Sequence, residues 1–277
     1  MKTLSFAMLC ALALGGCATG GPANAPAPAE KLVILTASGD LLRVTAARPD
    51  KVLARTAVKG LAADERLVGI DYRVARGELF GLSSRGQLYK LDAATGAVTA
   101  VGEPVALPEG SRFGFDFNPA ADRIRVVSDT GANLRRHPDT GAQVSRDPDL
   151  AFVPAAAIAA RPIVTAAGYT YNKRDEKLTT NYALDLATGS LVIQGSKEGE
   201  QPVVSPNTGL LAVVGPLLAG SIEDAALDIA DVNNTALAAL RSAGRTQLYQ
   251  IDLDTGRASR IGRIGSGEAI AGMAIEP

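Results

Sequence analysis

Three aspartates in similar short apolar segments are the first candidates for chemistry. Asp71 follows Val68-Gly69-Ile70, Asp116 follows Phe113-Gly114-Phe115, and Asp228 follows Ala226-Leu227. Side chains at equivalent points of neighbouring strands could converge, and converging carboxylates bind a cation or act on a substrate. Alternatively, each carboxylate accepts backbone N–H groups of its own or the next segment. The repetition of one residue type favours this second, structural role.

A basic cluster in the middle of the chain is the second candidate. Its basic residues alternate with apolar ones on two predicted strands, so the guanidinium groups lie on one face of a rigid sheet. Such groups hold a carboxylate, a phosphate or a sugar hydroxyl. They also form ion pairs, here with Asp122 and Asp129, and the sequence leaves both interpretations open. The predicted ligand-binding residues are Asp116, Asn118, Arg123, Arg125, Asn133 and Arg135.

A recurring turn explains the single histidine of the chain. Four copies of an apolar run, a polar residue, a short spacer and Thr-Gly place Asp92, His137, Asp185 and Asp252 at the same point. Asp caps a turn and Gly takes the positive φ that a hairpin needs, so His137 is predicted to be a turn residue. A lone histidine builds neither a zinc site nor a Ser-His-Asp triad. We therefore predict no cofactor and no catalytic residue, with a metal at Asp71, Asp116 and Asp228 as the alternative.

The spacing of these turns predicts an all-β fold. The polar positions are 45, 48 and 67 residues apart, which is typical of β-propeller blades with four short strands each. Blades are expected at 31–58, 67–101, 113–152, 163–217 and 226–264, and the irregular 163–217 segment would make six blades if it held two. The first blade lacks an inner strand, with strands only at 32–35, 41–44 and 52–55. The segment 271–277 should supply it and close the ring.

The N-terminus predicts export and lipidation. Lys2 and a short apolar run precede Leu14-Gly15-Gly16-Cys17, which resembles the lipobox of bacterial lipoproteins; cleavage after Ala25 is the alternative. Residues 1–17 would be the signal, Cys17 the acylated residue, 18–30 a flexible tether, and 31–277 one propeller domain. Because Ala18 carries no inner-membrane retention signal, the lipobox rule implies the outer membrane of a bacterial cell envelope.

Composition restricts the partners. The formal net charge is −1, which does not favour nucleic acid as a partner. Both cysteines, Cys10 and Cys17, lie within the predicted signal, so the mature chain has no thiol for a disulfide or for catalysis. The expected form is a monomer that contacts the membrane only through its lipid anchor.

One run of residues resembles a known family. It extends from Phe113 through Asn118-Pro119, Asp122 to Ser128 and Asn133-Leu134-Arg135, and together with residues 69–89 it is similar to the family called domain of unknown function 4394. The resemblance implies an exported bacterial propeller and supplies no established reaction or ligand.

Two functional hypotheses follow. The first is a lipid-anchored binding module that engages an envelope protein, a small molecule or a glycan through a ring face or the basic cluster. The second is a metal-dependent propeller hydrolase or lactonase that uses Asp71, Asp116 and Asp228.

Overall fold

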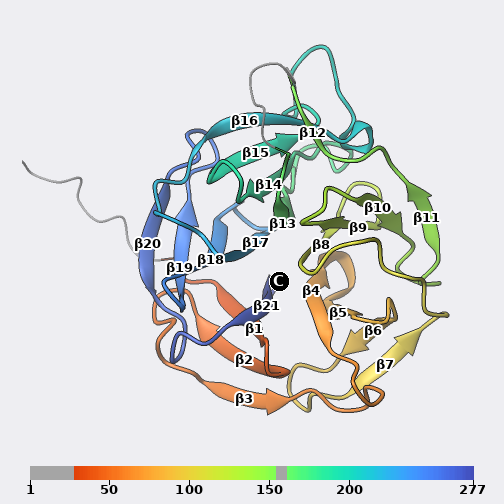
Figure 1. The fold of residues 1–277 in the computed structure, drawn as a ribbon, viewed down its shortest axis with the longest axis vertical. Coiled ribbons are helices and arrows are strands. Elements are labelled where there is room, and N and C mark those ends of the chain that lie inside the picture. Colours follow the sequence, from red (N-terminus) through yellow and green to blue (C-terminus); the bar gives the residue numbers. More distant parts are fainter. Residues whose placement is uncertain (1–27, 154–160) are drawn as a thin grey trace, which may run out of the picture.

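Five small sheets surround a common axis. The computed structural model describes residues 28–153 and 161–277, and in it the sheets stand around the centre as the blades of a propeller (Figure 1). The all-β, five-bladed prediction is confirmed, and the six-bladed alternative is wrong because residues 163–217 form only one sheet. Cys17, the predicted signal and most of the tether lie outside the described residues. Within the described part of the chain, no helix has the length and apolar character needed to cross a bilayer.

Each sheet has four antiparallel strands, and blade 4 carries one more. Blade 1 contains β1 (Lys31–Thr36), β2 (Asp40–Thr45), β3 (Ala54–Ala57) and β21 (Ile270–Ile275), and blade 2 contains β4 (Leu67–Arg73), β5 (Glu78–Ser83), β6 (Leu88–Leu91) and β7 (Val98–Val101). Blade 3 contains β8 (Phe113–Asn118), β9 (Arg123–Ser128), β10 (Asn133–Arg136) and β11 (Gln143–Arg146). Blade 4 contains β13 (Val164–Tyr169), β14 (Asn181–Asp185), β15 (Ser190–Gln194) and β16 (Leu210–Pro216), with β12 (Ala151–Phe152) added parallel to β16. Blade 5 contains β17 (Asp224–Ile229), β18 (Ala236–Ser242), β19 (Arg245–Ile251) and β20 (Ala258–Arg263). The described residues also form two single-turn 3₁₀ helices, η1 (Val74–Arg76) and η2 (Pro206–Thr208).

The C-terminal strand closes the ring, as predicted. β21 pairs antiparallel with β1, with Leu32 opposite Ile275 and Ile34 opposite Met273. The end of the chain therefore lies near the axis, beside the inner strands (Figure 1). This pairing covers an edge of β1 that would otherwise be open to a second chain.

Two predicted boundaries are wrong. Phe152 was expected to end blade 3, but it pairs in β12 with Leu211 of blade 4, because its buried ring belongs to the core between these two blades. The third strand of blade 1 was expected at 52–55, whereas β3 begins at Ala54. Val52 and Leu53 are apolar but exposed, so a prediction based on apolar residues started the strand too early.

Burial falls from the axis outward. Every residue of β4 and β13 is buried, whereas the outer strands β3 and β11 have no buried residue. Five apolar clusters fill the five interfaces between adjacent blades. Glycine makes the inner strands fit, because a Cβ at Gly69 would stand 2.7 Å from Cβ of Phe115 on the next blade. The Gly-x-Asp pattern is thus a packing requirement of neighbouring inner strands.

Two turn glycines offer a matched test of blade packing. Gly96 and Gly189 have φ of +75° and +62°, a region that costs an alanine about 1–2 kcal/mol. A Cβ at Gly189 meets nothing within 4 Å, but at Gly96 it would stand 2.0 Å from the carbonyl oxygen of Ala57 in blade 1. We expect Gly189→Ala to show only the φ cost and Gly96→Ala to lose a further ~1–3 kcal/mol from overpacking. Urea unfolding followed by circular dichroism measures both, and equal losses would contradict the docking of this turn on blade 1.

Candidate ligand-binding site

The three predicted aspartates meet at the axis. Asp71 on β4, Asp116 on β8 and Asp228 on β17 are all buried, and one carboxylate oxygen from each lies within 4.8 Å of the others. The topology brings them together because each occupies the same point near the C-terminal end of an inner strand. Their convergence was predicted from the repeat.

Each carboxylate links its blade to the next one around the ring. Asp71 accepts the N–H of Phe117 at 2.7 Å, and Asp116 accepts that of Tyr169 at 3.0 Å. Asp228 accepts the N–H of Ile275 at 2.6 Å. Inner strands have neighbours only along their outer edges, so these side chains satisfy backbone donors that would otherwise be buried without a partner.

Two of these aspartates also accept a nearby donor from their own strand. Asp71 accepts the N–H of Tyr72 at 2.7 Å and Asp228 that of Ile229 at 2.6 Å. Five of the six carboxylate oxygens are thus held by backbone N–H groups. This geometry matches the structural role that the repetition favoured and fits a metal ion poorly.

Burial changes the protonation of the cluster. It raises the pKa of Asp71 well above its ordinary value, and the charge of Asp228 raises it further. Burial, followed by the charge of Asp71, also raises the pKa of Asp116. Burial raises the pKa of Asp228 to about 7. The cluster therefore holds protons near neutral pH, which relieves the repulsion between like charges in a dry site.

A cavity opens above the cluster, at the C-terminal ends of the inner strands. Its volume is about 440 Å³, and its lining includes the three aspartates, Tyr171 and Glu176. Arg73 and Arg76 also line it, but both pair with Asp139, and Arg73 also pairs with Asp122. Acidic side chains outnumber basic ones in this lining.

A second cavity adjoins the first, between blades 3 and 4. It has a volume of about 380 Å³ and shares Asn118 and Tyr169 with the axial cavity. Its charged lining contains one acidic side chain, Glu198, and five basic ones: Arg123, Arg125, Arg135, Lys177 and Lys197. We call it the interblade cavity. Four of the six predicted ligand-binding residues, Asn118 and the three arginines, thus line one hollow.

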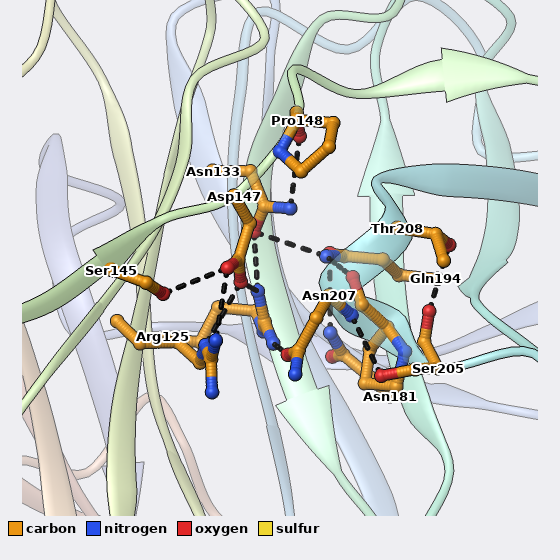
Figure 2. Close-up of polar contacts among 12 residues, drawn as sticks. Arg125, Asn133, Ser145, Asp147, Pro148, Asn181, Gln194, Ser205, Asn207 and Thr208 are labelled. Atoms are coloured by element: carbon orange, nitrogen blue, oxygen red, sulfur yellow. Dashed lines mark hydrogen bonds and ion pairs between the residues drawn. The ribbon is translucent and has the colours of Figure 1, made fainter.

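Arg125 is committed to the protein itself. Its side chain is 1% exposed and donates to Tyr169 Oη at 2.6 Å, to Asn207 Oδ1 at 2.7 Å and to Asn133 Oδ1. It also pairs with Asp147 at 3.2 Å. Figure 2 shows the guanidinium between Asn133 and Asp147 of blade 3 and Asn207 of η2 in blade 4. The arginine holds the two blades together, which leaves it little freedom to bind a ligand.

Asp147, and not Asp122 or Asp129, is the acid that this cluster uses. Arg135 grips it with two hydrogen bonds of 2.9 and 3.0 Å. Burial would raise the pKa of Asp147, but hydrogen bonds from Arg135 and Ser145 lower it overall. Asp122 pairs instead with Arg73, and Asp129 with Arg112. The sequence suggested Asp122 and Asp129 as ion-pair partners because they lie nearby in the chain. In the fold the partner is Asp147, which follows β11.

The other predicted residues have different positions. Arg123 is half-buried, and its guanidinium donates to the carbonyl oxygens of Ala121 and Asp122 at 3.5 and 2.7 Å, so its charge stays available to the cavity. Asn118 accepts the N–H of Ala121 at 3.0 Å. Asn133 is fully buried behind the cavity and donates to the carbonyl of Pro148, and Asp116 lies in the axial cluster. Whether any of them binds a ligand stays a prediction.

Sequence reasoning missed the wall that blade 4 supplies. Lys177 and Leu178 come from the loop before β14, and Lys197 and Val203 from the long loop between β15 and β16. The signal was present, since the last two turns are 67 residues apart where the others are 45 and 48. The extra residues between β15 and β16 build one side of the interblade cavity.

Comparison with known families agrees with this architecture. The family described as "Domain of unknown function (DUF4394)" matches residues 40–274, which is most of the chain. The protein belongs to this family. No curated protein is detectably similar to it in sequence.

Solved structures resemble this family member in fold. A chain from the crystal structure of a nidogen/laminin complex has a TM-score of 0.53 and 11% identity, and the match covers 90% of the present chain and 98% of that one. A structural genomics protein of unknown function from Bacteroides thetaiotaomicron has a TM-score of 0.45 and 14% identity, with 84% and 50% covered. At 11% identity the likeness to the first of these structures shows the fold alone.

Proposed function

We propose that this protein is a lipid-anchored binding module of the bacterial cell envelope that holds an anionic ligand in the interblade cavity. The observation that carries the proposal is a hollow of about 380 Å³, a size typical of small-molecule sites, whose lining holds five basic side chains and one acidic one. Asp147 pairs with Arg125 and Arg135, and Asp254 pairs with Lys197, so Arg123 and Lys177 supply the charge that a ligand would meet. Arg125 and Asp147 set the position of the wall, and Arg123 and Lys177 present positive charge to the cavity. The anchor rests on the lipobox ending at Cys17.

Binding of simple anions tests the site. Residues 30–277 contain every described strand, so this fragment can be titrated calorimetrically with phosphate and with citrate. We expect Arg123→Ala/Lys177→Ala to weaken binding at least tenfold, because each lost charge contact to an anion costs about 1.5–3 kcal/mol. The charge-matched control, Arg48→Ala/Lys51→Ala, changes exposed residues outside the cavity and should leave binding unchanged. Equal affinities for the two double variants would refute the site.

Fractionation of cells tests the anchor. The full-length protein should sediment with outer membranes, and Cys17→Ala should release it or leave its signal uncleaved, because the thioether that carries the lipid cannot form. A Cys17→Ala variant that still fractionates with the membrane as a processed protein would contradict lipidation.

A metal-dependent hydrolase or lactonase is the second candidate, and the convergence of Asp71, Asp116 and Asp228 within 4.8 Å favours it. The backbone N–H groups bound to five of the six oxygens count against it. Elemental analysis of protein purified from its own envelope decides between the two candidates: a stoichiometric metal lost in Asp116→Asn supports the enzyme.

A further inference from the structure

The interblade cavity joins two surfaces of different chemistry. Blade 3 contributes the guanidinium groups of Arg123 and Arg135, together with Ala120 and Ala121. Blade 4 contributes Leu178 and Val203, which are 41% and 72% exposed and have the space of the cavity beside them. Single exposed apolar residues are ordinary, but two of them on one charged hollow form a mixed rim that a ligand would have to match.

The apolar side of this rim is held in place. Val203 lies in the loop between β15 and β16, which is closed at its base by Ser196 and Val204: the N–H of Ser196 donates to Val204 O at 2.9 Å, and the N–H of Val204 donates to Ser196 Oγ at 3.0 Å. Leu178 is fixed by its N–H, which donates to Asp175 O at 3.0 Å. Both side chains are thus exposed on loops that are held by backbone hydrogen bonds, and neither of them belongs to an apolar core.

We infer that the ligand of the interblade cavity is an amphiphilic anion, a carboxylate or phosphate head joined to an aliphatic chain. The inference rests on the proposed function and adds the nature of the ligand. The head meets Arg123 and Lys177, and the chain covers Leu178 and Val203. A small hydrophilic anion would satisfy the charges and leave the apolar rim in water, whereas an aliphatic chain removes that surface from water.

Octanoate and acetate separate these cases, because they share a head and differ by six methylene groups. Each methylene group that becomes buried strengthens binding about fourfold, so we expect calorimetry on residues 30–277 to show octanoate binding at least tenfold more tightly than acetate. Octyltrimethylammonium has an alkyl chain of similar length with the opposite charge and should bind at least tenfold more weakly than octanoate. Equal affinity for octanoate and acetate, or for octanoate and octyltrimethylammonium, would overturn the inference.

Substitution on the rim locates the effect. Leu178→Ser/Val203→Ser should remove the advantage of octanoate and leave acetate binding unchanged, and both side chains are exposed enough for the fold to tolerate the change. Val52→Ser/Leu53→Ser alters two exposed apolar residues of blade 1 and serves as the control. Unchanged octanoate binding in the rim variant would refute the assignment.

The two proposals fail in different ways. If phosphate and citrate binding depends on Arg123 and Lys177 but octanoate shows no gain over acetate, only the amphiphilic ligand is wrong. If the variant that lacks Arg123 and Lys177 binds phosphate, citrate and octanoate as the unchanged protein does, the anion site is wrong and the amphiphilic ligand with it.

Discussion

Replacing Arg125 with methionine is expected to lower the free energy of unfolding by about 3–5 kcal/mol. Methionine keeps part of the buried volume but removes four contacts, to Tyr169, Asn133, Asp147 and Asn207. Deleting one partner of a buried ion pair leaves polar groups without compensation, and losses of this size follow. Urea unfolding of residues 30–277 followed by far-ultraviolet circular dichroism measures the change.

Arg123→Met is the matched control for Arg125→Met, because it lies two residues earlier on the same strand and faces the same cavity. Its guanidinium is half-buried and, among the residues that the structure describes, donates only to the carbonyl oxygens of Ala121 and Asp122, so the expected loss is below about 1 kcal/mol. Similar losses for both variants would show that Arg125 does not join blades 3 and 4.

Stability is expected to fall as the pH rises from 5 to 8. The pKa of Asp228 is raised to about 7 in the folded protein, and those of Asp71 and Asp116 are also raised, so the folded state holds protons that the unfolded chain releases. Stability from such a group is complete below the unfolded pKa of about 4 and is lost as the pH passes through the folded pKa. Asp228 alone should contribute a loss of about 3 kcal/mol over this interval.

The chosen interval separates the axial cluster from the surface acids. Hydrogen bonds lower the pKa values of three surface acids: Asp92 through backbone N–H groups, Asp139 through Arg73, and Asp254 through Lys197. These acids affect stability below pH 5, where their contribution to stability rises with pH instead of falling. Unfolding of Asp228→Asn should depend less on pH between 5 and 8, whereas Asp92→Asn should keep the original slope. A stability that rises over this interval would mean that the cluster is ionised when folded and would favour a bound cation.

The sequence predicted those features that repeat. The Thr-Gly turns predicted the spacing of the blades, and the apolar segments predicted the inner strands that surround the axis. The absence of an inner strand from blade 1 predicted that β21 closes the ring. The meeting of Asp71, Asp116 and Asp228 followed from the same regularity, because equivalent residues of a ring must face one axis. Periodic sequence features are readable because each copy solves the same packing problem.

The interblade cavity escaped prediction because it depends on what does not repeat. Asp147 follows β11 and Asn207 lies in η2, and both contact Arg125. Neither residue stands at a sequence distance from Arg125 that would have indicated this contact. Alternation along β9 placed Arg123 and Arg125 on one face but could not show that Arg125 is enclosed by blade 4. The burial of a side chain in a long-range contact depends on the neighbouring blade, whose loops have irregular lengths.

Ring closure by β21 also sets the order in which this fold can be completed during synthesis. While a nascent chain is still shorter than 270 residues, β1 lacks its inner partner and Asp228 lacks the N–H of Ile275. Contacts between distant segments form slowly because a long loop must close first. Blades 2 to 5 can assemble along the growing chain, but the propeller closes only after β21 has been made. Ring closure would therefore be the last step of folding, because it requires β21 to reach β1 across the whole length of the propeller domain.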